Sequence, residues 1–161
     1  TERYYEEEGR AELTPRDFGI LMHRVFENAA TTDEIYMAIE AMTQDGVLDE
    51  KEAPRLRELV EKALADPVTA EWFGGRWQVV RNENEIILPG SGTTRRPDRV
   101  MTDGERAVVV DYKFGDRETA RHRKQIREYL RLLRQMGYTR TEGYLWYVRL
   151  GRTERVEEKE D

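Results

Sequence analysis

The stretch from Arg95 to Tyr112 constrains the fold more than any other part of the chain, because it has the pattern of one β-hairpin. Residues 95–102 contain β-formers, and Asp103-Gly104 has the composition of a two-residue hairpin turn. Residues 105–112 contain the run Ala-Val-Val-Val, which is typical of a buried strand. The sequence therefore predicts two antiparallel strands joined at Asp103-Gly104.

The register of this hairpin brings two carboxylates together. With Asp103-Gly104 as the loop, Asp98 lies opposite Val109, and Asp111 is the diagonal neighbour of Asp98 on the same face. Lys113 follows Asp111 by two residues, so strand alternation puts it on that face as well. Two carboxylates suit a hard divalent cation, and a lysine beside them suits a phosphate or a bound water. This layout is typical of metal-assisted phosphodiester hydrolysis.

Length and composition exclude several classes of protein. A chain of 161 residues predicts one domain with a real core, and 38% apolar residues with aromatics is not a disordered composition. There is no run of about eighteen apolar residues to span a membrane, and no signal-peptide pattern. The absence of cysteine excludes disulfides, thiolate zinc sites and an iron–sulfur cluster. The chain starts at Thr1, so we expect a fragment of something longer.

The net charge of -6 argues against nucleic acid, but the distribution of charge does not. Residues 113–140 contain nine Lys or Arg and three acidic residues, while acids gather at 6–8 and 157–161. A basic field beside a carboxylate site can attract a polyanion despite an acidic total. The alternative is an ordinary solvated helix face.

The remaining pattern predicts helices first, then strands, a long helix and a last strand. An apolar stripe of Ile20, Leu21, Val25 and Phe26 marks the first helix. A helix between the hairpin and the last strand predicts a βαβ crossover and a mixed sheet. The expected helices are 17–30, 33–43, 49–65, 68–73 and 117–136, the expected strands outside the hairpin are 76–81, 85–88 and 141–150, and the acidic end is expected to be disordered.

Other candidate residues are weak when taken singly. Asp-x-Lys occurs by chance in many proteins, but a carboxylate such as Asp111 at the end of a buried strand needs a partner or an ion. His23 matters only if its helix packs across the hairpin, and Glu27 falls on the same helix face. Gln125 and Tyr129 lie one turn apart, where they could hold a phosphate or orient the lysine.

Five stretches in one order resemble a known family: Gly19–Glu27, Glu85, Pro97–Val100, Val110–Gly115, and Gln125 with Tyr129. They are similar to the RecB/AddA-type nuclease domain of the PD-(D/E)xK superfamily, found at the C-terminus of UvrD-like helicase–nucleases. The resemblance covers roughly residues 17–148. It implies an α/β (α+β) fold with a restriction-endonuclease-like core, in which helices flank a mixed central β-sheet and the N-terminal part is helical. The expected organisation is a lead-in at 1–16, a nuclease domain at 17–150 with a helical insertion at about 33–73, and an acidic tail at 151–161.

The resemblance also implies roles for individual residues. Asp98, Asp111 and His23 would ligate Mg²⁺ or Mn²⁺ together with the Tyr112 carbonyl, and Lys113 would position or activate the attacking water. The residues expected to bind DNA or to support the site are Glu27, Glu85, Arg99, Gln125 and Tyr129.

Two departures from the family pattern stand out. Arg96-Pro97 precedes Asp98, where the family usually has a glycine and an aliphatic residue, and Phe114 stands where a small hydroxyl residue is common. Because proline cannot donate to a sheet ladder, we expect an edge or a bulge at that point. Neither departure removes a ligand.

Three functional hypotheses follow. The first is a metal-dependent exonuclease-like DNase module that cuts single-stranded DNA in double-strand-break repair and recombination, in the cytoplasm of a bacterial-type cell at the nucleoid. No phosphate-binding loop is present, so the helicase motor would lie upstream in the same polypeptide. The second is a catalytically inactive module for DNA binding or protein docking. The third is a stand-alone restriction or phage-type nuclease.

Overall fold

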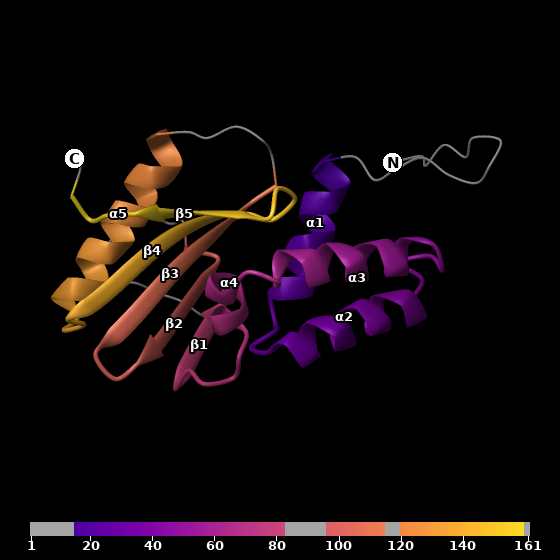
Figure 1. The fold of residues 1–161 in the computed structure, drawn as a ribbon, viewed down its shortest axis with the longest axis horizontal. Helices are drawn as coiled ribbons and strands as arrows, with labels where there is room; N and C mark the ends of the chain where they lie inside the picture. The colour runs from indigo at the N-terminus through magenta and orange to yellow at the C-terminus, as the bar shows by residue number, and fades with distance from the viewer. Residues whose placement is uncertain (1–14, 83–95, 115–119, 160–161) are drawn as a thin grey trace.

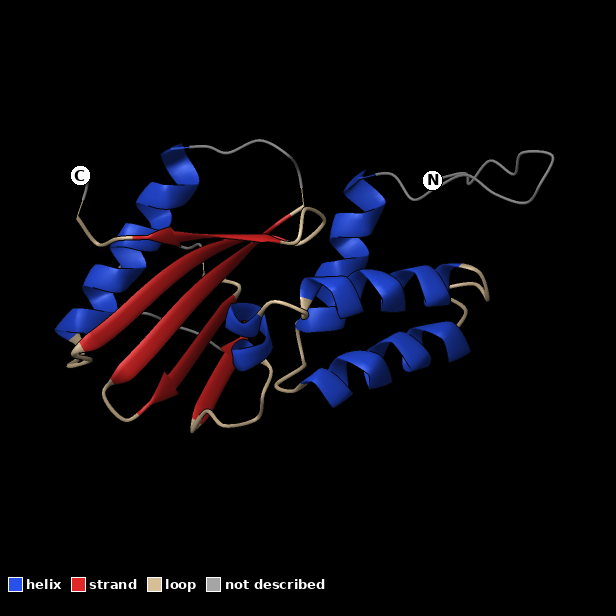
Figure 2. Ribbon diagram, viewed as in Figure 1, coloured by secondary structure: helices blue, strands red, loops and turns tan. Residues whose placement is uncertain are grey.

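The computed structural model describes residues 15–82, 96–114 and 120–159, and it contains a helical part beside a sheet (Figures 1 and 2). The helices and strands are α1 (Pro15–Phe26), α2 (Thr32–Gln44), α3 (Glu52–Ala63), α4 (Pro67–Trp72), β1 (Val79–Asn82), β2 (Arg99–Asp103), β3 (Arg106–Lys113), α5 (Ala120–Gln135), β4 (Arg140–Tyr147) and β5 (Arg152–Val156).

The five strands form one sheet in the order β1-β2-β3-β4-β5. All neighbouring pairs are antiparallel except β3 and β4, which run parallel and are joined through α5. A parallel pair needs a crossover connection, and α5 makes it across one face of the sheet (Figure 1). The predicted βαβ unit, the mixed sheet and the α+β class are therefore confirmed.

Alternation along β3 divides the core between the two faces of the sheet. Val108, Val110 and Tyr112 belong to the cluster that includes the apolar side chains of α1 to α4. Val109 lies between Val108 and Val110 and faces the other side of the sheet, where it belongs to the cluster formed with α5. The strand is apolar on both faces because helices cover both, as the continuous valine run indicated.

The N-terminal helices are fixed at their ends by short polar side chains. Thr31 caps α2 by accepting a hydrogen bond from the Glu34 amide, and Asp66 caps α4 by accepting from the Val68 amide. The predicted stripe of α1 is correct for Leu21, Val25 and Phe26 but wrong for Ile20, which is 51% exposed. The other residues of the stripe are apolar at helical spacing, and Ile20 lies outside the buried arc.

The hairpin turn lies one residue later than predicted. Asp103 pairs with Arg106, so Gly104 and Glu105 form the turn. Gly104 has φ of 58° and occupies the first central position, where a positive φ requires glycine in one of the two common hairpin turns. The pairing therefore shifts, and Asp98 comes to lie beside Asp111 rather than opposite Val109.

Two further expectations need correction. Residues 152–156 form edge strand β5 against β4, and Val156 is buried, so this part of the acidic end is not a disordered tail. β2 is an internal strand between β1 and β3, and Pro97 lies just before it rather than at an edge or a bulge. The predicted strand at 85–88 lies outside the described residues. In the part of the chain that the structure describes, every helix is too short or too polar to cross a bilayer.

Candidate active site

Asp98 and Asp111 meet at the end of the hairpin through reciprocal hydrogen bonds. The Asp98 amide donates to Asp111 Oδ1 at 3.1 Å, and the Tyr112 amide donates to Asp98 Oδ2 at 2.7 Å. Each carboxylate thus accepts a hydrogen bond from a backbone amide of the opposing segment, at the point where the backbone hydrogen bonds between β2 and β3 would otherwise continue. Asp111 is 1% exposed, and its Oδ2 atom is buried with no hydrogen-bond partner in the described structure.

His23 approaches this pair from the helical part. Its Nδ1 atom lies 3.8 Å from Asp98 Oδ1, and its ring packs against the rings of Tyr112 and Phe114. The side chain of His23 is 36% exposed, whereas that of Asp98 is 13% exposed. The packing of α1 across the end of the hairpin, on which a role for His23 depended, is therefore present.

Lys113 is buried at 8% exposure, two residues after Asp111 on the same strand. Strand alternation places the two side chains on one face, as predicted. The Lys113 carbonyl accepts a hydrogen bond from the Val148 amide, which ties the end of β3 to the residue after β4. Burying an ammonium is costly unless it is paired, so this position favours a charged neighbour or ligand.

Arg99 lies inside the protein rather than on a DNA-facing surface. It is fully buried, and its guanidinium donates to the carbonyls of Ala29, Ala30 and Trp72 at 2.6, 3.0 and 2.9 Å. It also lies 4.0 Å from the centre of the Phe73 ring. Burial lowers the pKa of Arg99 from its ordinary value, although an arginine remains protonated near neutral pH. Of the two roles expected for it, Arg99 can therefore have only the supporting one.

The structure relates the remaining candidate residues less directly to the carboxylate pair. Glu27 lies one turn after His23 and is half-buried, and its amide donates to the His23 carbonyl. Tyr129 is buried on the α5 face that packs against the sheet. Gln125, one turn earlier, has a buried Oε1 atom with no hydrogen-bond partner in the described structure. Glu85 lies outside the described residues.

The residue types at this site suit a hard cation, but their positions do not enclose one. Two carboxylates and an imidazole are ligands that Mg²⁺ or Mn²⁺ accepts, and the Asp111 Oδ2 atom is available. Within the described ranges, however, no three His, Asp or Glu side chains have the spacing to hold one metal ion. A cation held by Asp98 and Asp111 would give the unpaired Asp111 Oδ2 atom a partner. His23 would need to move closer to act as a third ligand.

Sequence reasoning missed two features of this site. Phe114 contacts His23 on one side and Phe18 on the other, with ring centres 5.0 and 5.7 Å apart. Nothing in the sequence signals this contact, because it depends on how α1 packs. The internal position of Arg99 did have a signal, since strand alternation puts it on the face opposite its neighbours Asp98 and Val100.

Two carboxylates and a lysine at the end of a hairpin are residues that suit metal-assisted phosphodiester hydrolysis. The family model of the PD-(D/E)XK nuclease superfamily matches residues 2–161, and the chain belongs to this superfamily. The motif of its name occurs here as Pro97-Asp98 and Asp111-Tyr112-Lys113. Members of the superfamily are in general nucleases that use divalent metal ions. A comparison with curated proteins gives no match.

Proposed function

We propose that this protein is a Mg²⁺- or Mn²⁺-dependent deoxyribonuclease of the RecB/AddA type, acting on single-stranded DNA. The observation that carries the proposal is the reciprocal hydrogen bonding of Asp98 and Asp111, which leaves Asp111 Oδ2 buried and unpaired while His23 lies 3.8 Å from Asp98 Oδ1. Buried unpaired oxygens of this kind are costly without a ligand. The order of the five sequence stretches supports the finer assignment, including an upstream helicase domain and a role in double-strand-break repair.

The chain's own residues divide the work as follows. Asp98 and Asp111 would hold the cation, with His23 and the Tyr112 carbonyl as further ligands. A bound cation would neutralise charge on the scissile phosphate and lower the pKa of water. Lys113 would orient the attacking water and stabilise the negative charge that builds up on the phosphate. Arg99 holds the chain segments behind Asp98 in place, because it joins β2 to the segment after α1 and to the end of α4.

Cleavage of a labelled single-stranded oligonucleotide, with Mg²⁺ or Mn²⁺ and with EDTA, tests the proposal. We expect metal-dependent cleavage that falls by about 100-fold or more in Asp111→Asn and in Lys113→Met. The Asn side chain keeps an oxygen to accept from the Asp98 amide, so the fold is retained. Asp103→Asn is the matched control, because Asp103 is an exposed carboxylate at the other end of β2. Unchanged cleavage in both site variants would rule out the assigned site.

A second candidate is an inactive nuclease fold that binds DNA or docks a protein. It is favoured by one observation, the absence among the described residues of three ligating side chains with metal spacing. Calorimetric titration of Mn²⁺ separates the two. Binding that is lost in Asp111→Asn supports the nuclease, and no binding to the wild type supports the inactive module.

A further inference from the structure

A groove lies between α1, α3 and the turn that connects β4 to β5. It encloses about 390 Å³, and its apolar lining consists of the partly buried Leu59 and the buried Phe18 and Leu56. The charged residues around it are Arg55, Glu58, Lys62 and Arg149. We call this feature the α1–α3 groove. It is outside the carboxylate site, and the motifs discussed above do not include its charged residues.

The groove is basic in a protein that is acidic overall. Three of its four charged side chains are cationic, while the chain has a net charge of -6. The single acid, Glu58, pairs with Lys62 at 3.1 Å. Arg55 and Arg149 are exposed and take part in none of the ion pairs seen among the described residues. The Arg149 guanidinium lies 5.7 Å from the centre of the Phe18 ring, and neither arginine is neutralised by a carboxylate in these ion pairs, so an anionic ligand would meet two guanidinium groups.

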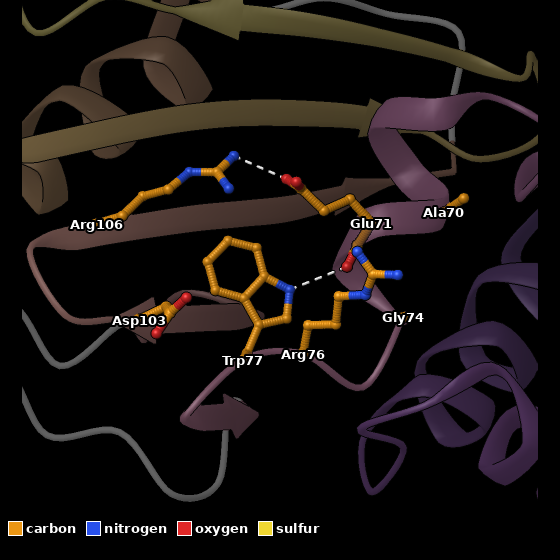
Figure 3. Close-up of a pocket in the computed structure, with 7 residues that line it drawn as sticks. All are labelled: Ala70, Glu71, Gly74, Arg76, Trp77, Asp103 and Arg106. Atoms are coloured by element: carbon orange, nitrogen blue, oxygen red, sulfur yellow. Dashed lines mark hydrogen bonds and ion pairs between the residues drawn. The ribbon is translucent and has the colours of Figure 1, made fainter.

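A second cavity provides a contrast (Figure 3). It encloses about 480 Å³ and is lined by Trp77 and by two arginines and two acids. Its Arg106 is already engaged by Glu71 at 2.7 Å and by Glu142 at 2.6 Å. The charges of this cavity balance, so it has no comparable preference for a polyanion.

Contacts between aromatic rings connect the α1–α3 groove to the candidate active site. Phe18, in the groove, packs against Phe114, and Phe114 packs against His23. From the other side, Arg149 lies two residues after Tyr147, which pairs with Lys113. Figure 1 shows the turn between β4 and β5 next to α1. A strand with its scissile phosphate at Asp98 and Asp111 would thus pass the groove within a short distance.

We propose that the α1–α3 groove binds the phosphate backbone of single-stranded DNA beside the scissile bond, with Arg55 and Arg149 as the phosphate contacts. The partly buried Leu59 offers an apolar contact to the sugar or base of the same nucleotide. This inference rests on the proposed function, because it assigns the path of that substrate.

Equilibrium binding without cleavage tests the groove. Fluorescence anisotropy of a labelled oligothymidylate is measured in EDTA over a series of salt concentrations, for wild type and for Arg55→Gln/Arg149→Gln. We expect the Kd of the double variant to rise about tenfold or more. The salt slope should fall by about 1.4, since each phosphate contact on a single strand contributes about 0.7. Arg76→Gln/Arg81→Gln, which removes two exposed arginines outside the α1–α3 groove, is the matched control and should bind as wild type.

The outcomes separate this inference from the proposed function. An unchanged Kd and salt slope in a folded double variant, or no binding by the wild type, overturns the groove. If the double variant loses as much affinity for a duplex of the same length as for the single strand, the assignment of the groove to single strands is overturned. Cleavage is measured separately, with Mn²⁺. If the protein does not cleave DNA, a loss of binding in the double variant still shows that the groove binds the strand.

Discussion

Asp98 and Arg99 are adjacent in sequence, but their side chains lie in different environments. Asp98 lies at the carboxylate site, where it accepts from the Tyr112 amide, whereas Arg99 points into the core and is fully buried. The three carbonyls that Arg99 binds belong to the segment after α1 and to the end of α4. The position of Asp98 therefore depends on helices that are remote in sequence.

Replacing this arginine tests how much the arrangement stabilises the protein. Arg99→Met fills a similar volume but leaves three buried carbonyls without a donor, so we expect a loss of about 3 kcal/mol in the free energy of unfolding. Urea denaturation followed by circular dichroism measures it. Arg81→Met, on the exposed part of β1, is the control and should change stability by less than about 0.5 kcal/mol. A loss below about 1 kcal/mol for Arg99→Met would show that water satisfies the carbonyls.

At the scale of elements, the sequence predicts the parts of the fold that depend on local pattern. The hairpin, the crossover helix and the four N-terminal helices have clear periodicity, caps and turn residues. The sequence predicts the turn one residue early, because Asp103-Gly104 and Gly104-Glu105 both supply a glycine at a permitted position. The sequence does not signal β5, because edge strands can be short and charged and only pairing with β4 defines this one.

The candidate site was predictable to the same extent. Asp98 and Asp111 come together through the hairpin alone, and the shift of the turn brings them closer than the predicted diagonal. The approach of His23 could not be predicted from its helix, because it depends on the packing of α1 against Tyr112 and Phe114.

The contact between α5 and β4 depends on a glycine. A Cβ atom at Gly143 would overlap Ile126 and press against Leu130 on α5. We expect Gly143→Ala to destabilise the protein by about 1–3 kcal/mol through overpacking, measured by urea denaturation. The same change at Gly19 in α1 should instead stabilise by roughly 0.5–1 kcal/mol, because its Cβ would meet Phe114 at an ordinary 3.5 Å and alanine favours a helix. Equal effects at both positions would contradict this account.

An ion pair joins β3 to β4 and should make stability depend on pH. Burial alone would raise the pKa of Glu142, but its hydrogen bonds with Arg106 outweigh burial and lower the pKa. A lowered folded-state pKa means that the pair stabilises fully above the usual glutamate pKa and is lost as pH falls below it.

Glu142→Gln should therefore be less stable than wild type near neutral pH, and the two should converge in acid. Urea midpoints measured between about pH 7 and pH 3 check this. Glu157→Gln, which removes an exposed partner of Arg155, is the control and should follow the wild-type curve. A constant difference between Glu142→Gln and wild type at all these pH values would exclude ionisation as the cause.

At the scale of the whole molecule, the candidate active site and the proposed DNA groove lie where the helical part meets the sheet. The carboxylate pair belongs to the sheet, His23 belongs to α1, and the α1–α3 groove adds α3 and the turn after β4. An acidic protein can in this way present a local cationic surface to DNA beside anionic ligands for a metal. The arrangement requires the two parts to remain docked, so the cation and the fold should be thermodynamically linked.

This linkage gives a prediction on the stability of the whole protein. In the absence of metal, Asp111→Asn should melt at the same temperature as wild type or above it, because it removes one of two adjacent negative charges. With Mn²⁺ at about 100 times its Kd, wild type should gain about 2.7 kcal/mol, or a Tm rise of roughly 5–10 °C. Asp111→Asn should lose this rise and Asp103→Asn should keep it, as measured by differential scanning calorimetry. An equal rise in wild type and Asp111→Asn would place the cation elsewhere, whatever the cleavage assays show.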